Sequence, residues 1–217
     1  MWTNAFRDAV LDTYESGGAA VAAAACYVGF IKSISDWRAG TVVEADYTGY
    51  GTRPLCTLGV VGNTSPVGGR QRANDVAITF PQNTGASQDV IGWGKWSAAT
   101  AGVLHDINLL DSDPPVYGVG NVDNTISSPA HGLQTDQRCF VEAAPGALLP
   151  AGLSENVAYF VLAAGLTADV FKLATTSAGV EIDITTAGAI MISPYKVVTI
   201  ANAATPEFAI GSLVFQV

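Results

Sequence analysis

The chain has 217 residues, of which 13% are charged and 49% hydrophobic, and its formal net charge is −9. This composition lies outside the range of disordered chains, and the length suits one or two domains with a hydrophobic core. The charge is uneven, because residues 1–98 hold seven Lys/Arg against eight Asp/Glu, whereas residues 99–217 hold three against eleven. The acidic balance excludes nucleic acid as an expected partner, since a phosphate backbone would be repelled.

The first predicted element is a short amphipathic helix over residues 3–15. Its apolar residues, from Trp2 to Tyr14, recur three or four positions apart. Trp2 and Phe6 are therefore candidate interface residues, although such a stripe more often packs inside its own chain. The apolar run of residues 17–31 that follows is shorter than the roughly 20 residues of a membrane span. It also lacks the basic start of a signal peptide, so we expect neither secretion nor a membrane partner.

The rest of the chain is predicted to be β-structure. Short runs rich in Val, Ile, Thr, Phe and Tyr alternate with Gly, Pro, Asn and Asp clusters. The candidate strands are "ACYVGFIKS", "RPLCTLGVV", "NDVAITFP", "DVIGWGKWSA", "GVLHDINLL", "RCFVEAA", "AYFVLAA", "VFKLATT", "VEIDITTA", "AIMISP", "KVVTIANA" and "FAIGSLVFQV". Many short strands after one helix predict an all-β fold, built as a sandwich or barrel.

Two breaks divide this β-structure. The acidic, proline-bearing "DSDPPV" and the later "SPYK" at 193–196 are predicted joints. They define a base domain of residues 1–116 and 197–217, interrupted by an inserted β-module of residues 117–196. The module has enough residues to form a small fold of its own.

Two stretches with paired glycines are predicted to be turns. They are "GYGTRP" at 49–54 and "YGVGNV" at 117–122. A phosphate-binding loop would follow a strand and open a helix, and neither stretch does so.

The stretch "SSPAHGLQTDQRCF", residues 127–140, is the main catalytic candidate. A nucleophilic site would need His131 to activate Ser127, Ser128 or Cys139, with Asp136 orienting the imidazole. We favour a tight turn that leads into a strand, because Pro129 restricts the backbone and His131 precedes a glycine. Cys139 lies within a predicted strand and is expected in the core. We therefore expect no catalytic residues and no enzymatic activity.

Metal ligands are too scattered to predict a site. The two histidines, His105 and His131, lie on different predicted domains, and there is no Cys-x-x-Cys pair for zinc. The acidic residues Asp106, Asp111 and Asp113 lack the glycine and distal glutamate of a calcium loop, although a low-affinity calcium site is the alternative. We expect no metal and no cofactor.

The three cysteines, Cys26, Cys56 and Cys139, are widely spaced, and an odd number cannot form a closed disulfide framework. We expect them to be reduced and mostly buried.

Trp93 and Trp96 are the remaining candidate interface residues. An odd separation puts them on opposite faces of a regular strand, so one should fill the core while the other could be an exposed anchor. A bulge at Gly94 would change this assignment.

Two parts of the chain resemble one family. The segments "CYVGFIKS", "EADYTGYGTRP" and "NDVAITFPQNTGASQDVIGWGKWSAATAGVLHDINL", with the ending "VVTIANAATPEFAIGSLVFQV", resemble small virion proteins of tailed bacteriophages. That family is described as tail-fibre-like or capsid-decorating. The intervening "ISSPAHGLQTDQRCFVEAAPGALLPAGLSENVAYFVLAAGLTADVFKLATTSAGVEIDITTAG" is similar to a β-repeat of phage structural proteins, with its "HGL", "LPxGL", "YFV" and "FxLA" motifs.

These resemblances imply a non-enzymatic structural protein of the virion. We expect a capsid decoration protein on the capsid exterior, with the near-neutral base bound to the major capsid protein and to copies of itself. The resemblance implies a homo-oligomer, with a trimer as the common form. The acidic module, with seven Asp/Glu and three Lys/Arg, would then project. The alternative is a tail-fibre or distal-tail component that binds a host receptor or glycan. A remote alternative, a polysaccharide hydrolase, would require two carboxylates facing across a cleft, and Glu181 and Asp183 lie on one predicted strand.

Overall fold

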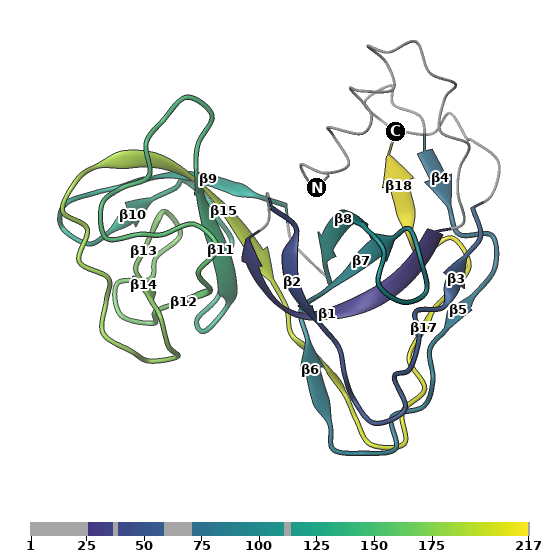
Figure 1. Ribbon diagram of the computed structural model, residues 1–217. Coiled ribbons are helices and arrows are strands. Elements are labelled where there is room, and N and C mark those ends of the chain that lie inside the picture. Colours follow the sequence, from purple (N-terminus) through teal and green to yellow (C-terminus); the bar gives the residue numbers. More distant parts are fainter. Residues whose placement is uncertain (1–25, 37–38, 59–70, 111–113, 217) are drawn as a thin grey trace, which may run out of the picture. The chain divides into compact units, whose positions relative to one another are not determined.

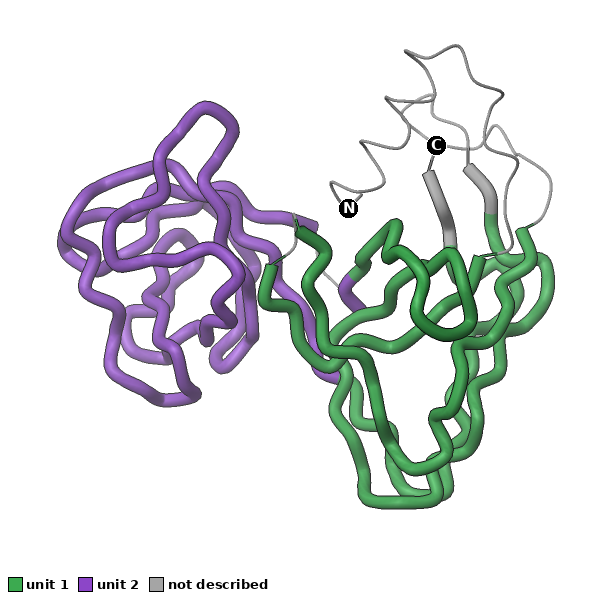
Figure 2. Tube along the Cα trace, in the orientation of Figure 1, with its two compact units in different colours: residues 1–108, 198–217 green, residues 109–197 purple. Residues whose placement is uncertain are grey.

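The computed structural model describes residues 26–36, 39–58, 71–110 and 114–216, and the chain forms two compact units. The first unit comprises residues 1–108 and 198–217, and the second comprises residues 109–197 (Figure 2). The predicted N-terminal helix, with Trp2 and Phe6, lies outside the described residues. The described part is built from strands and contains no helix, which confirms the all-β prediction (Figure 1). No described helix is long and apolar enough to cross a membrane.

The strands of the first unit come from both of its chain segments. They are β1 (Cys26–Asp36), β2 (Thr41–Glu44), β3 (Leu55–Cys56), β4 (Gln71–Ala73), β5 (Ile78–Thr79), β6 (Gln88–Val90), β7 (Gly92–Trp96), β8 (Leu104–Leu109), β16 (Val198–Ile200), β17 (Glu207–Phe208) and β18 (Val214–Gln216). The main sheet has the order β2-β1-β7-β8, and β3 also pairs with β1. β1 and β7 are antiparallel without a bulge, from Tyr27 opposite Trp96 to Ile31 opposite Gly92.

The last segment of the chain completes the first unit. β16, β17 and β18 pair in turn with β6, β5 and β4, so residues 198–216 run antiparallel along residues 71–90. This pairing carries Phe208 into an aromatic cluster, where its ring lies 5.3 Å from Phe30 and 5.8 Å from Phe80. Phe30 and Phe80 are themselves 4.2 Å apart and buried. The core of this unit therefore joins segments more than 100 residues apart in the sequence.

The second unit is a nearly closed antiparallel barrel. Its strands are β9 (Val116–Gly120), β10 (Ile126–Ser127), β11 (Arg138–Ala143), β12 (Tyr159–Val161), β13 (Val170–Phe171), β14 (Leu173–Ala174) and β15 (Gly188–Tyr195). The sheet order is β13-β10-β9-β15-β11-β12-β14, and its two end strands are consecutive in the chain, separated only by Lys172. The sheet therefore curls back on itself around a core that includes Ile126, Val141 and Ile190.

Several local predictions need correction. Residues 117–122 were predicted to be a turn, but most of them belong to β9, in which Tyr117 and Val119 alternate with glycines. The predicted break at 193–196 is wrong as well, because β15 continues to Tyr195. Pro194 is tolerated there because the described pairing of β9 with β15 ends at Ile192, so Pro194 need not donate a hydrogen bond to β9. Finally, "VEIDITTA" forms only an isolated bridge at Glu181.

Candidate functional site

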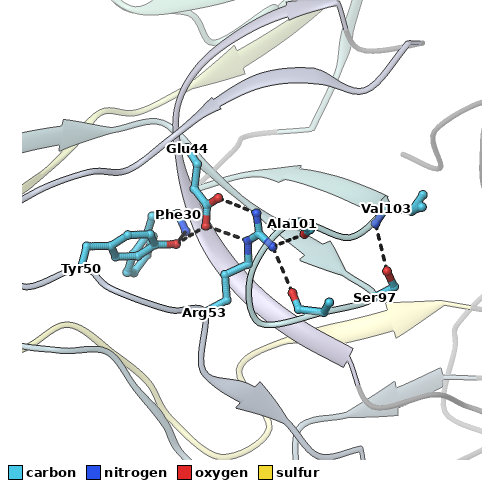
Figure 3. Close-up of polar contacts among 8 residues, drawn as sticks. Phe30, Glu44, Tyr50, Arg53, Ser97, Ala101 and Val103 are labelled. Atoms are coloured by element: carbon cyan, nitrogen blue, oxygen red, sulfur yellow. Dashed lines mark hydrogen bonds and ion pairs between the residues drawn. The ribbon is translucent and has the colours of Figure 1, made fainter.

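The most connected polar cluster of the first unit surrounds Arg53 (Figure 3). Glu44 ends β2, and Tyr50 and Arg53 lie on the loop between β2 and β3. The other partners lie on β1, at the end of β7 and on the loop after β7. Arg53 Nε donates a hydrogen bond to Glu44 Oε1 at 2.8 Å, and Nη2 donates to Oε2 at 2.6 Å. This bidentate salt bridge fixes both the position and the plane of the guanidinium.

The other side of the guanidinium holds the loop after β7. Nη1 donates to the carbonyl oxygens of Ala98, at 3.0 Å, and Ala101, at 2.6 Å. Arg53 Cζ also lies 4.2 Å from the centroid of the Trp96 ring, a cation–π contact. Val103 N–H donates to Ser97 Oγ at 2.9 Å and closes the same loop. Arg53 therefore joins two loops whose bonded residues are 45 and 48 positions apart in the sequence.

Tyr50 completes the cluster. Its hydroxyl donates to Glu44 Oε1 at 2.6 Å and accepts the Phe30 N–H at 3.2 Å. Burial, together with the hydrogen bond to the Glu44 carboxylate, raises the pKa of Tyr50 far above its usual value, so the hydroxyl stays protonated. Because these groups already bond to one another, the cluster is equipped to hold two loops together rather than to carry out a reaction.

Two opposed glycines make room for this cluster. Gly29 of β1 lies opposite Gly94 of β7. A Cβ at Gly29 would lie 2.6 Å from Glu44 Oε1, and one at Gly94 would lie 2.7 Å from the Trp96 ring. Because these two glycines have no side chains, Glu44 and Trp96 can pack directly against the backbone of β1 and β7.

Both tryptophans of β7 are buried. Trp93 faces the aromatic core, with its ring 6.1 Å from that of Phe208, and Trp96 lies on the other face under Arg53. The prediction of opposite faces is confirmed, because the strand has no bulge at Gly94. The expectation of one exposed anchor is wrong, since Trp93 is 7% and Trp96 4% exposed. The loops that Arg53 holds cover the second face, and the alternation of residues along a strand cannot show this.

The catalytic candidates of the second unit do not form a triad. His131 Nδ1 accepts the Leu133 N–H at 2.9 Å, which closes the predicted turn, and its ring packs edge-on against Phe171 at 4.9 Å. Asp136 accepts the hydroxyl of Ser177. Cys139 is completely buried, and burial raises its pKa to about 12, which suppresses the thiolate that a nucleophile requires.

The other polar candidates also have partners within the chain. Ser127 Oγ accepts from Asn121 at 3.0 Å, and Ser128 Oγ donates to the Tyr117 carbonyl at 2.7 Å. The Glu181 carboxylate binds Lys172 at 2.6 Å and Asn124 at 3.1 Å.

Of the three aspartates considered for a calcium site, only Asp106 lies within the described residues. Asp106 lies on β8 and accepts from the Ile107 N–H and the Asn108 amide, whereas Asp111 and Asp113 lie outside the described residues. In the described ranges, no three His, Cys, Asp or Glu side chains come together as a metal site would require.

The second unit presents an apolar patch on the outer face of its barrel. Tyr117 and Val119 are 60% and 45% exposed, while Gly118 and Gly120 between and after them point inward. The register places Met191 opposite Tyr117, and Ala189 and Ser127 opposite Val119. Opposed residues share one face of an antiparallel sheet, so these five residues, Tyr117, Val119, Ser127, Ala189 and Met191, form one surface, the outer-face patch.

The outer-face patch was missed by the sequence analysis. The alternation "VYGVG" carries the signal of a strand, because its larger side chains recur every second residue. The paired glycines were interpreted as a turn instead. Inside the barrel, a Cβ at Gly120 would lie 2.9 Å from Pro150 of the "LPAGL" segment, so these glycines serve close packing.

Comparison with known proteins identifies the family. The profile of the family described as "Podophage GP4 fiber I protein gp80" matches residues 1–122. The match includes the Arg53 cluster and both tryptophans of β7. No curated protein matches the chain. The matched region covers more than half of the 217 residues, so the chain belongs to the podophage gp80 fibre family, whose members are structural fibre proteins of the virion.

Proposed function

We propose that the chain is a tail-fibre component whose second unit binds a neutral glycan of the host surface through the outer-face patch. The family match supports a fibre role, and thus favours the alternative expectation over capsid decoration. The single observation that supports the glycan is the exposed ring of Tyr117 in a row of small and apolar side chains. Binding by a fibre of this kind involves no reaction.

The chemistry of the outer-face patch suits a sugar ring. The C–H face of a pyranose packs against an aromatic ring, while its hydroxyls seek polar groups at the edge of that contact. Ser127 supplies such a group beside Val119, and Asn121 holds its hydroxyl in place at 3.0 Å. A surface of these five residues suits weak contacts that gain strength when several copies act together.

The charge of the second unit favours a neutral ligand. Its residues, 109–197, hold three Lys/Arg and nine Asp/Glu, a net charge of 3 − 9 = −6. This charge repels anionic surface polymers, such as those rich in phosphate or uronate.

The binding test uses the purified full chain and intact host cells or their isolated surface glycan. Tyr117→Ala should weaken binding about tenfold or more, because a central aromatic anchor contributes most of such a contact. The matched control is Val180→Ala, since Val180 is 88% exposed on the same unit but lies in the loop between β14 and β15. Equal binding by both variants and the unchanged chain would contradict the proposed patch.

The position in the virion is tested by counting copies. Quantitative mass spectrometry of purified particles should give a small number of these chains relative to the major capsid protein. A ratio near one per capsid subunit would instead support decoration, with the major capsid protein as partner. Light scattering of the purified chain tests self-assembly, for which we propose a homo-oligomer, with a trimer as the first stoichiometry to examine.

A further inference from the structure

Two of the three cysteines lie directly opposite each other in the first unit. The register of β1 and β3 pairs Cys26 with Cys56, and Tyr27 with Leu55. Directly opposed residues of antiparallel strands have Cα atoms about 4.5–5.5 Å apart, and a disulfide requires roughly 4.4–6.8 Å. The backbone therefore already has a separation that a disulfide can span.

The Cys26 thiol also contacts the backbone of Cys56. Cys26 Sγ donates to the Cys56 carbonyl at 3.1 Å, and both residues are buried. Interaction with the Cys56 side chain is the main cause that lowers the pKa of Cys26, against the opposing effect of burial. The same contact raises the pKa of Cys56. A lowered pKa favours the thiolate, the form of cysteine that attacks a disulfide.

The strand that carries Cys56 is short. β3 is held to β1 by two residue pairs, and the Val28 N–H adds a hydrogen bond to the Pro54 carbonyl at 3.1 Å. So short a ladder opens more readily than a long one, and this opening gives a small oxidant access to the buried pair. Cys139, in contrast, belongs to β11, which pairs with β15 over six residue pairs.

We propose that Cys26 and Cys56 are a redox modification site, at which a small-molecule disulfide such as oxidised glutathione converts the two thiols into an intramolecular cross-strand disulfide. The Cys26 thiolate attacks one sulfur of the oxidant, forming a mixed disulfide and releasing one thiolate. Cys56 loses its proton and attacks Cys26 Sγ, which releases the second thiolate. The protein loses two electrons and two protons, and one oxidant disulfide becomes two thiols.

The new bond would close the chain between residues 26 and 56. This loop contains Glu44, Tyr50 and Arg53, so the disulfide would tie β1 covalently to the segment that carries the Arg53 cluster. A crosslink of this kind restricts the unfolded chain and so raises the melting temperature. The fold is unchanged, because the pairing of the two strands already exists.

The experiment counts thiols in the purified full chain. One sample is treated with dithiothreitol and one with oxidised glutathione; both are then denatured, alkylated and mapped by mass spectrometry. The reduced chain should carry three alkylated cysteines. The oxidised chain should carry one, at Cys139, together with a linked peptide pair that contains Cys26 and Cys56 and a melting temperature several degrees higher.

Two variants make the outcome specific. Cys139→Ala should still lose both remaining thiols on oxidation, whereas Cys56→Ala should keep Cys26 as a thiol or a glutathione adduct and show no rise in melting temperature. Three alkylated cysteines after oxidation of the folded chain would overturn the proposal. So would a stable glutathione adduct at Cys26 beside a free Cys56, or a disulfide that links two chains.

Discussion

The guanidinium of Arg53 lies over the ring of Trp96, with Cζ 4.2 Å from the ring centroid, while its nitrogens bind Glu44 and two loop carbonyls. One side chain thus covers Trp96 and links Glu44 to the loop after β7. The fibre-family match extends across all of these residues. The strongest tests of the fold therefore begin with this contact.

Arg53→Ala should destabilise the first unit by about 3 kcal/mol, because the Glu44 carboxylate loses its cationic partner and keeps only the Tyr50 hydroxyl, and two carbonyl oxygens lose the guanidinium donor. Arg53→Lys should recover only part of this loss, since an ammonium cannot form the two parallel bonds. Chemical denaturation followed by tryptophan fluorescence measures both. The control is Lys32→Ala, whose partner Asp46 has a 69% exposed side chain, and which should change stability far less. Equal losses from Arg53→Ala and Lys32→Ala would contradict the role of the cluster.

Gly94→Ala should displace Trp96, because the new Cβ would lie 2.7 Å from its ring and 2.8 Å from Leu104. We expect a shift in tryptophan emission and a loss of roughly 1–3 kcal/mol of stability, typical of overpacking. Gly51→Ala is the matched control, because a Cβ there meets no atom within 4 Å. An unchanged emission spectrum for Gly94→Ala would contradict the predicted displacement of Trp96.

Gly152→Ala should impair folding of the second unit. Gly152 has a φ of +104°, and its Cβ would overlap the Asp183 carbonyl oxygen, a backbone atom that cannot move alone. Gly146 also has a positive φ, +79°, but a Cβ there meets no atom within 4 Å. Gly146→Ala should therefore cost only about 1 kcal/mol, from backbone strain alone. Thermal unfolding of both variants separates the two effects, and equal melting temperatures would refute the steric argument.

Acid should weaken the second unit in part through Glu181. Hydrogen bonds from Lys172 and Asn124 lower the pKa of Glu181 below its ordinary value of 4.5. A depressed carboxyl pKa contributes stability above its unfolded value, and this contribution is lost as the pH falls through the folded pKa. The melting temperature of Glu181→Gln should therefore lie below that of the unchanged chain at pH 7, with the gap closing below about pH 4. A gap that stays constant across this range would contradict the assignment.

The sequence alone was sufficient for the fold class and for several roles of individual residues. Runs of β-branched and aromatic residues predicted strands such as β1, β7, β11 and β15, because the period of a strand is local and appears in neighbouring residues. The same locality predicted the turn at His131, whose bond to the Leu133 N–H spans two residues. It also placed Trp93 and Trp96 on opposite faces.

Tertiary structure decided which segments cover the faces of the strands and which residues lie opposite each other on paired strands. Trp96 is buried because Arg53, far along the chain, lies over it, and Cys26 faces Cys56 because β3 pairs with β1. The glycines of β9 suit a turn by local rules, and only the Pro150 segment packed against them explains why they lie in a strand. Each of these features depends on contacts between distant segments, whereas a local pattern reports only the preferences of adjacent residues.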